Sequence, residues 1–187
     1  MKIYIDEHID DFNLERALLE LSDQRREQAL GFKFERGQRT CALAYLLLKR
    51  ALREQYGIVE NPLFEYGEHG KPSIVGHPEI HFNLSHCREA VACVGSDHPV
   101  GVDVESIQRF NESLVRYTMN AQEVESVLSA AQPGIAFTRL WTMKEALLKL
   151  TGEGITNDIK DVLVNSKASF TTTECIPQGY IYTVCEF

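Results

Sequence analysis

The sequence lacks the features of membrane and secreted proteins. None of its apolar stretches approaches the roughly 20 residues that a membrane-spanning helix needs. The predicted N-terminal strand runs into Asp6 and Glu7 without the basic region of a secretory leader. There is no low-complexity tract and no disordered tail in the 187 residues. We therefore expect a globular protein with no membrane segment and no leader.

Cysteine is present but lacks the spacing of a disulfide framework or a zinc site. The five cysteines are odd in number and none forms a Cys-x-x-Cys pair. His69, His77 and His81 are separated by eight and four residues across Gly/Pro turns, which fits no standard zinc site. We expect free thiols in a reducing compartment, and the cytoplasm is the default location.

The charge is unevenly distributed. The formal net charge is −8, yet residues 24–53 hold eight basic side chains against two acidic ones. A basic face on an acidic protein fits a polyanionic ligand or an acidic protein partner. It does not suit general nucleic-acid binding, for which a basic domain with interleaved aromatic residues is expected.

Hydrophobic periodicity and turn residues divide the chain into helices and short strands. Gly57 is a natural helix stop, Asn120 with Glu123 forms a capping box, and Pro133-Gly134 interrupts the helical pattern. Helices are predicted at 13–21, 22–30, 38–56, 120–131 and 135–150, and strands at 2–5, 63–66, 80–84, 90–95, 100–105, 162–165, 169–173 and 180–185.

Each half of the chain thus combines helices with a small antiparallel sheet. This order favours an α+β fold with two similar lobes, residues 1–98 and 99–187, although no sequence identity between the halves is visible. At this length the lobes would share one compact structural unit.

Two segments of the second half place acids and a lysine where they can meet. Asp103 and Glu105 are two apart in a predicted strand and so share one face. Trp141, Glu145 and Lys149 are four apart in a predicted helix and share one face as well. If the helix crosses the strand, three carboxylates and an ammonium converge, which suits Mg²⁺ and a phosphate. Taken alone, each pattern is also typical of solvent-exposed charges.

Two further segments give these patterns a context. Gly70-Lys71-Pro72 forms a turn, and Phe82-Asn83-Leu84-Ser85-His86 ends a strand. Together with Gly101-Val102-Asp103-Val104-Glu105 and the Trp141-to-Lys149 helix, in this order, they make the chain resemble the surfactin-type (Sfp-type) 4′-phosphopantetheinyl transferases. The resemblance runs from the first strand to the last. It implies a pseudo-twofold α+β protein with its site at the lobe interface.

The resemblance also implies an activity. Family members transfer the 4′-phosphopantetheine of coenzyme A to a carrier-protein serine and release adenosine 3′,5′-bisphosphate. The acids matching Asp103, Glu105 and Glu145 surround Mg²⁺ in the family, and the same oxygen donors accept Mn²⁺. Lys149 and the metal would neutralise the leaving phosphate, Asp103 would act with them, and Glu145 is the candidate base, directly or through a metal-bound water.

The resemblance places coenzyme A against residues from several segments. Gln28 stands where the family often has a second basic residue, three positions after Arg25. Arg39 and Thr40 open the long first-half helix, where a phosphate is well held. Ser85 and His86 match a pair that contacts coenzyme A phosphates. The expected coenzyme A contacts are Arg25, Arg39, Thr40, Lys71, Pro72, Ser85, His86 and Lys149.

Partners and alternatives complete the sequence-based hypothesis. We expect an acyl or peptidyl carrier protein as partner, no nucleic acid and no membrane, and a monomer, because the chain carries two predicted lobes. A non-catalytic module that binds coenzyme A or a carrier protein is one alternative. A Mg²⁺-dependent phosphohydrolase is the other.

Overall fold

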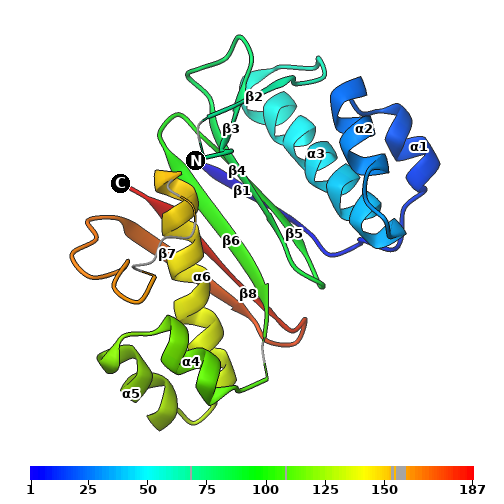
Figure 1. Ribbon diagram of the computed structural model, residues 1–187. Helices are drawn as coiled ribbons and strands as arrows, with labels where there is room; N and C mark the ends of the chain where they lie inside the picture. The colour runs from blue at the N-terminus through cyan, green and yellow to red at the C-terminus, as the bar shows by residue number, and fades with distance from the viewer. Residues whose placement is uncertain (68, 108, 153, 155–158) are drawn as a thin grey trace.

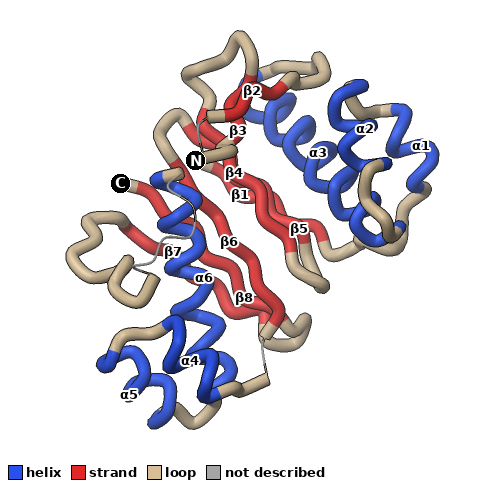
Figure 2. The backbone as a smooth tube through the Cα atoms, viewed as in Figure 1, coloured by secondary structure: helices blue, strands red, loops and turns tan. Residues whose placement is uncertain are grey.

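The fold is mixed α+β, with small antiparallel sheets covered by helices (Figure 1, Figure 2). The computed structural model describes residues 1–67, 69–107, 109–152, 154 and 159–187. Its helices are α1 (Leu14–Leu19), α2 (Asp23–Leu30), α3 (Glu35–Tyr56), α4 (Glu112–Thr118), α5 (Ala121–Ser129) and α6 (Pro133–Thr151). Its strands are β1 (Lys2–Asp6), β2 (Phe64–Tyr66), β3 (Pro72–Ile74), β4 (His81–His86), β5 (Val91–Ser96), β6 (Val100–Ser106), β7 (Ser169–Cys175) and β8 (Tyr180–Glu186).

Two three-stranded sheets lie side by side. The first has the order β1-β5-β4 and the second the order β6-β8-β7, and every pairing is antiparallel. Side chains of β4 join the sheets: the backbone N–H of Val102 donates to Asn83 Oδ1 at 3.0 Å, and that of Val104 donates to Ser85 Oγ at 3.2 Å. Because buried N–H groups need partners, these bonds hold β6 next to β4.

One long helix covers each sheet (Figure 1). In the first half, α3 buries an almost continuous apolar face against the first sheet, and Gly57 ends it in the left-handed conformation at φ 71°. In the second half, α6 packs on β6 and β8, with Ala146, Leu147 and Leu150 in a core shared with Cys185. The position of α6 decides the geometry of the site described below.

The close approach of α6 to β6 depends on Gly101. A Cβ atom at this position would lie 2.1 Å from the carbonyl oxygen of Ala146 and 2.7 Å from the backbone nitrogen of Leu150. Both neighbours are backbone atoms of α6, so neither can move away as a flexible side chain could. Gly101 therefore lets the helix rest on the strand.

We predict that Gly101→Ala destabilises the protein by about 2–3 kcal/mol, because the added methyl group forces α6 away from β6. Chemical denaturation measures this loss. The matched change Gly67→Ala, at a glycine whose Cβ would meet nothing closer than 3.7 Å, should cost much less. Equal losses in the two variants would contradict the packing argument.

Several predicted elements are confirmed and others are wrong. The Asn120–Glu123 capping box is present at the start of α5. The predicted strand at 162–165 is wrong, because these residues form turns in which the N–H of Val164 donates to the carbonyl of Asp161. Asn165 has φ 64°, which ends any extended run there.

Two helix starts also differ from the prediction. Pro133 does not interrupt a helix but occupies the first turn of α6, where its missing N–H costs nothing. The helix α3 begins at Glu35, three residues before its predicted start at 38. Helix α4 was not predicted, and Asn111 caps it by accepting from the N–H of Leu114.

No helix in the described part of the chain is long and apolar enough to cross a membrane. All five cysteines are free thiols.

Candidate active site

The packing of α6 on β6 brings Asp103 and Lys149 into contact. Lys149 Nζ lies 2.7 Å from Asp103 Oδ1. The Asp103 carboxylate is almost fully buried, whereas the Lys149 side chain is 29% exposed. One side of this ion pair is therefore open to a ligand.

Ser85 of β4 completes a three-way junction with this pair. Its hydroxyl donates to Asp103 Oδ1 at 2.9 Å and accepts from Lys149 Nζ at 2.8 Å. It also accepts from the N–H of Val104. All the hydrogen-bonding positions of this buried hydroxyl are used, so Ser85 holds Asp103 and Lys149 in place across the boundary between the sheets.

Two more carboxylates lie near Asp103. Burial, followed by the negative charge of Asp103, raises the pKa of Glu105 to about 7, and a hydrogen bond from Trp141 Nε1 to Glu105 Oε1 at 3.3 Å opposes the shift. Burial and the charge of Asp103 also raise the pKa of Glu145, against the opposing charge of Lys149. The three acids thus feel one another's charge, with one lysine beside them.

The Glu105 pKa predicts a pH effect on stability in metal-free protein. In the folded protein the pKa of Glu105 is about 7, which lies above the value of 4.5 for an ordinary glutamate in an unfolded chain. Protonated Glu105 therefore stabilises the fold fully below about pH 4.5, and this contribution is lost as pH rises through 7. We expect Glu105→Gln to gain stability relative to the wild type between pH 5 and 8, measured by urea unfolding with a chelator. A pH-independent difference would contradict this.

The acids fit a divalent cation, although they do not form a complete cage by themselves. Asp103 Oδ2 is buried and has no hydrogen-bond partner, and Glu105 and Glu145 both have raised pKa values that a cation would reverse. In the described part of the chain, no three His, Cys, Asp or Glu side chains lie close enough to hold an ion together. Mg²⁺ tolerates such a site, because it keeps several waters and binds substrate phosphates alongside one or two carboxylates.

Two neighbouring cavities lie beside this junction. We call the first, of about 260 Å³, the arginine cavity, and the second, of about 200 Å³, the lysine cavity. They share Pro72 and Leu84 as a common wall. The predicted contacts Arg25, Thr40, Pro72, Ser85 and His86 line the arginine cavity, and Lys71, Pro72 and Lys149 line the lysine cavity.

Arg25 supplies the permanent charge of the arginine cavity. Its guanidinium donates to Gln28 Oε1 at 2.8 Å and to the carbonyl of Cys41 at 3.3 Å, and its Nε is buried without a partner. His86 is solvent-accessible, but partial burial lowers its pKa, and the positive charges of Lys149 and Arg25 lower it further. Gln28 orients Arg25 without adding a second charge.

Comparison with known proteins identifies the family. The profile of the 4′-phosphopantetheinyl transferase superfamily (ACPS) matches residues 99–183, the stretch that includes β6 and α6. The chain is 34% identical over 154 residues to the 4′-phosphopantetheinyl transferase psf-1 of Bacillus pumilus, an alignment that covers 79% of the chain and 66% of that protein. It is 27% identical over 156 residues to Sfp of Bacillus subtilis strain 168, covering 82% and 70%. It is 34% identical over 148 residues to AcpT of Salmonella typhi, covering 75% and 72%.

The chain belongs to the Sfp-type 4′-phosphopantetheinyl transferases. Its matched stretch spans about two thirds of the length of the Bacillus pumilus relative.

Two lysines of this transferase have clear structural partners. Lys71 Nζ donates to the carbonyl of Leu150 at 2.8 Å, which satisfies a free carbonyl at the C-terminal end of α6, and burial lowers its pKa. Lys144 is fully buried and lines neither the arginine cavity nor the lysine cavity. It pairs with Glu123 Oε2 at 2.8 Å and donates to the carbonyls of Ile159 and Lys160. Although Lys144 is next to Glu145 in the sequence, it serves the packing of α6 and does not face the site.

Arg39 is not brought to the site in this transferase. Its guanidinium pairs with Glu35 at 2.8 Å, donates to the carbonyl of Phe12 and lies over the Phe12 ring. Thr40, one residue later, points to a different face of α3 and donates to the carbonyl of Arg36. Because α3 starts at Glu35, both residues lie in its second turn, and neither N–H is a free helix-end donor. The expectation that this pair opens the helix is therefore wrong, because α3 begins at Glu35, whereas contact of Arg39 and Thr40 with coenzyme A stays a prediction.

Proposed function

We propose that the protein transfers the 4′-phosphopantetheine group of coenzyme A to a serine of an acyl or peptidyl carrier protein. The observation that carries this proposal is the junction of Asp103, Ser85 and Lys149. Glu105 and Glu145 lie near this junction, and the arginine and lysine cavities, which are lined by basic side chains, lie beside it. The names of the relatives support it, because psf-1, Sfp and AcpT are all described as 4′-phosphopantetheinyl transferases.

The two cavities suit the nucleotide half of coenzyme A. Arg25 with its unpaired Nε, together with His86 and Thr40, would face the 3′-phosphate in the arginine cavity. Lys71 and Lys149 would face the pyrophosphate from the lysine cavity, where the turn at Gly70 and Pro72 presents Lys71. This arrangement leaves the β-phosphorus of the pyrophosphate beside the carboxylates.

The reaction is an in-line phosphoryl transfer. A bond forms between the carrier serine oxygen and the β-phosphorus, and the bond from that phosphorus to the bridging oxygen breaks. Adenosine 3′,5′-bisphosphate leaves with the electron pair. Lys149 stabilises the charge that develops on the leaving phosphate, and Asp103 and Ser85 keep its ammonium in position.

Glu145 is the proposed base for the serine proton. In the metal-free protein, burial and the charge of Asp103 raise its pKa, which makes it a better proton acceptor than an ordinary glutamate, and a bound metal would reduce this advantage. It lies on the same face of α6 as Lys149, so the base and the cation are carried by one rigid element.

Asp103, Glu105 and Glu145 would surround Mg²⁺ or Mn²⁺, with one or two of them as direct ligands and with water and substrate phosphates as the others. When bound, the metal supplies charge neutralisation at the phosphate oxygens and lowers the proton affinity of its ligands. The unpaired Asp103 Oδ2 is the oxygen of this chain that most needs such a partner.

The finer structural and cellular interpretation is also a proposal. Residues 1–98 and 99–187 would be two related lobes, supported by one long helix over one three-stranded sheet in each. Two lobes in one chain would allow a monomer to carry the complete site.

The free thiols support a location in the cytoplasm, where the protein would encounter coenzyme A and carrier proteins. The basic residues 24–53 offer a surface to an acidic carrier.

Intact-mass spectrometry of apo carrier proteins tests the proposal. Acyl, polyketide and peptidyl carriers are incubated separately with the protein, coenzyme A and Mg²⁺. We expect a mass gain equal to one phosphopantetheine on at least one carrier, lost with a chelator and lost when the carrier serine is replaced by alanine. No gain on any carrier would contradict the proposed function.

A further inference from the structure

The middle of α6 is held to the sheet by a row of hydroxyl groups. The hydroxyl oxygens of Thr142 and Thr183 lie 2.8 Å apart, and that of Thr172 lies 2.9 Å from Thr183. The Thr142 hydroxyl also donates to the carbonyl of Arg139 at 3.0 Å. Because each hydroxyl has one hydrogen, Thr142 accepts from Thr183, which in turn accepts from Thr172. We call Thr142, Thr172 and Thr183 the threonine bridge.

The threonine bridge lies beside the proposed reacting centre. Thr183 is directly opposite Asp103 in the β6–β8 pairing, so both side chains project from the same face of the sheet. Both reach α6, Thr183 at Thr142 and Asp103 at Lys149. Thr142 lies three residues before Glu145, on the same side of the helix. A shift of α6 at Thr142 would therefore move the Glu145 carboxylate and the Lys149 ammonium relative to Asp103.

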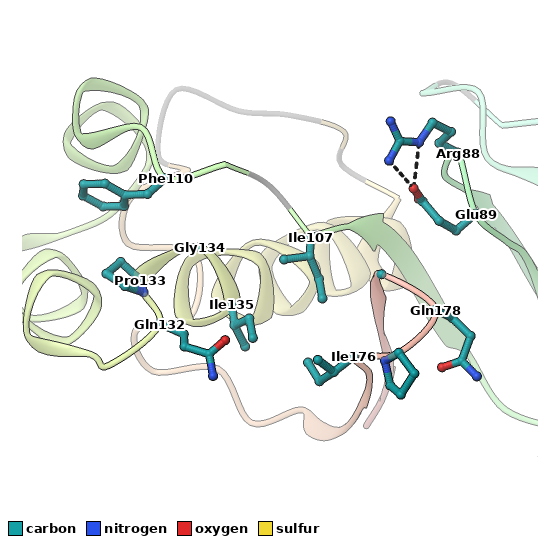
Figure 3. Close-up of a pocket in the computed structure, with 12 residues that line it drawn as sticks. Arg88, Glu89, Ile107, Phe110, Gln132, Pro133, Gly134, Ile135, Ile176 and Gln178 are labelled. Carbon is teal, nitrogen blue, oxygen red and sulfur yellow. Dashed lines mark hydrogen bonds and ion pairs between the residues drawn. The ribbon is translucent and has the colours of Figure 1, made fainter.

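Neighbouring parts of α6 have contacts without a fixed direction. Its first turn borders a cavity of about 540 Å³, and Figure 3 shows the side chains of Ile107, Ile135 and Ile176 around this space. Nearer its C-terminal end, Ala146 shares an apolar core with Cys185. Apolar contacts favour burial without a preferred direction, whereas hydrogen bonds require a defined distance and angle. The threonine bridge therefore defines the rotation of α6 on the sheet.

Burial makes the threonine bridge a strong constraint. Thr142 and Thr183 are fully buried, so a shift that broke their hydrogen bond would leave a polar group that water cannot satisfy. An ion pair between Arg139 Nε and Glu174 Oε1, at 2.7 Å, links the same part of α6 to β7. Both of its side chains are partly exposed, and such pairs contribute little. The buried hydroxyls therefore constrain the helix more than this ion pair does.

We propose that Thr183, acting through Thr142, is a positioning residue of the transfer reaction. Thr183 lines neither the arginine cavity nor the lysine cavity. It holds α6 at the rotation that places Glu145 and Lys149 against Asp103. A misplacement of about 1 Å can cost on the order of a hundredfold in rate, so one remote hydroxyl has a measurable effect. The proposal rests on the proposed function and adds the side chains that align its base and its cation.

Two opposite substitutions at Thr183 test this role. Thr183→Val keeps the volume of the side chain and removes the hydroxyl, whereas Thr183→Ser keeps the hydroxyl and removes a methyl group. In assays of holo-carrier formation, we expect Thr183→Val to lower kcat by about tenfold or more, with KM for coenzyme A changed by less than about threefold. We expect Thr183→Ser to keep at least about half of the wild-type kcat, because it retains the hydrogen bond.

Two further variants complete the kinetic test. Thr142→Val removes the same hydrogen bond from the helix side, so it should match Thr183→Val, and the double variant should be no slower than either. Thr118→Val is the matched control. Thr118 is almost fully buried and donates to the carbonyl of Leu114, four residues earlier in α4, so its loss should leave kcat within about twofold.

The fluorescence of Trp141 reports the position of α6 without any transfer. Trp141 is the single tryptophan of the chain, precedes Thr142 and donates to Glu105 Oε1 at 3.3 Å. In the presence of a chelator and without a carrier, we expect the emission maximum of Thr183→Val to differ from that of the wild type. The maximum of Thr183→Ser should stay unchanged.

Two results would overturn the proposal. One is a kcat of Thr183→Val within about twofold of the wild type. The other is an equal loss of kcat in Thr183→Ser and Thr183→Val, which would assign the effect to packing. A wild type that binds coenzyme A and modifies no carrier would overturn the proposed function instead, whatever the fluorescence, which keeps the two failures distinguishable.

Discussion

Replacing Asp103 by asparagine should lower kcat/KM for carrier modification by on the order of 10³-fold. Asparagine keeps the shape of the side chain but removes the charge that Lys149 and the proposed metal need. The fold should survive, because Lys149 is partly exposed and can be solvated again. Kinetics of holo-carrier formation and chemical denaturation measure the two effects in the same variant.

The exposed Asp161 provides the matched control. Asp161→Asn makes the same chemical change outside the site and should leave both kcat/KM and the unfolding midpoint unchanged. A folded Asp103→Asn variant with more than a tenth of wild-type kcat/KM would contradict the assignment of Asp103 to the reacting centre.

Lys144→Ala should destabilise the protein by about 3–5 kcal/mol, because it leaves Glu123 without its ion-pair partner in a largely buried place. The carbonyls of Ile159 and Lys160 lose their donor in the same change. For a protein of this size the loss corresponds to a fall in Tm of roughly 6–20 °C. Urea unfolding and calorimetry measure it directly.

Two further variants separate the loss of the buried ion pair from the effect of removing any lysine. Lys167→Ala removes an exposed lysine and should change stability by less than about 0.5 kcal/mol. The double variant Lys144→Met with Glu123→Leu replaces the pair by apolar side chains and should recover part of the loss. A loss below about 1 kcal/mol in Lys144→Ala would show that this buried pair does not hold α5 and the 159–160 turn to α6.

Local periodicity was sufficient to place the acids and Lys149 on common faces. The two-residue spacing of Asp103 and Glu105 and the four-residue spacing of Glu145 and Lys149 are local properties, and α6 does cross β6 so that Lys149 meets Asp103. The sequence also predicted α3 to its final residue, because Gly57 is a strong local stop.

Non-local contacts explain what the sequence could not show. Lys144 follows a polar pattern that favours solvent, and its partners lie 21 residues before and 15 or 16 residues after it. Arg39 is adjacent to Thr40, yet the helix points it at Glu35 and Phe12. The apolar run at 162–165 resembles a strand, but β7 pairs with β8, and these residues turn before it begins.

The most direct test of the central claim is to measure both products of one reaction. Holo-carrier is quantified by intact mass and adenosine 3′,5′-bisphosphate by chromatography, with and without apo carrier. We predict equal amounts of the two products and no bisphosphate release when the carrier is omitted. Bisphosphate released without a carrier would indicate a phosphohydrolase. Coenzyme A bound with neither product formed would indicate a binding module, and either result would contradict the transferase proposed for this chain.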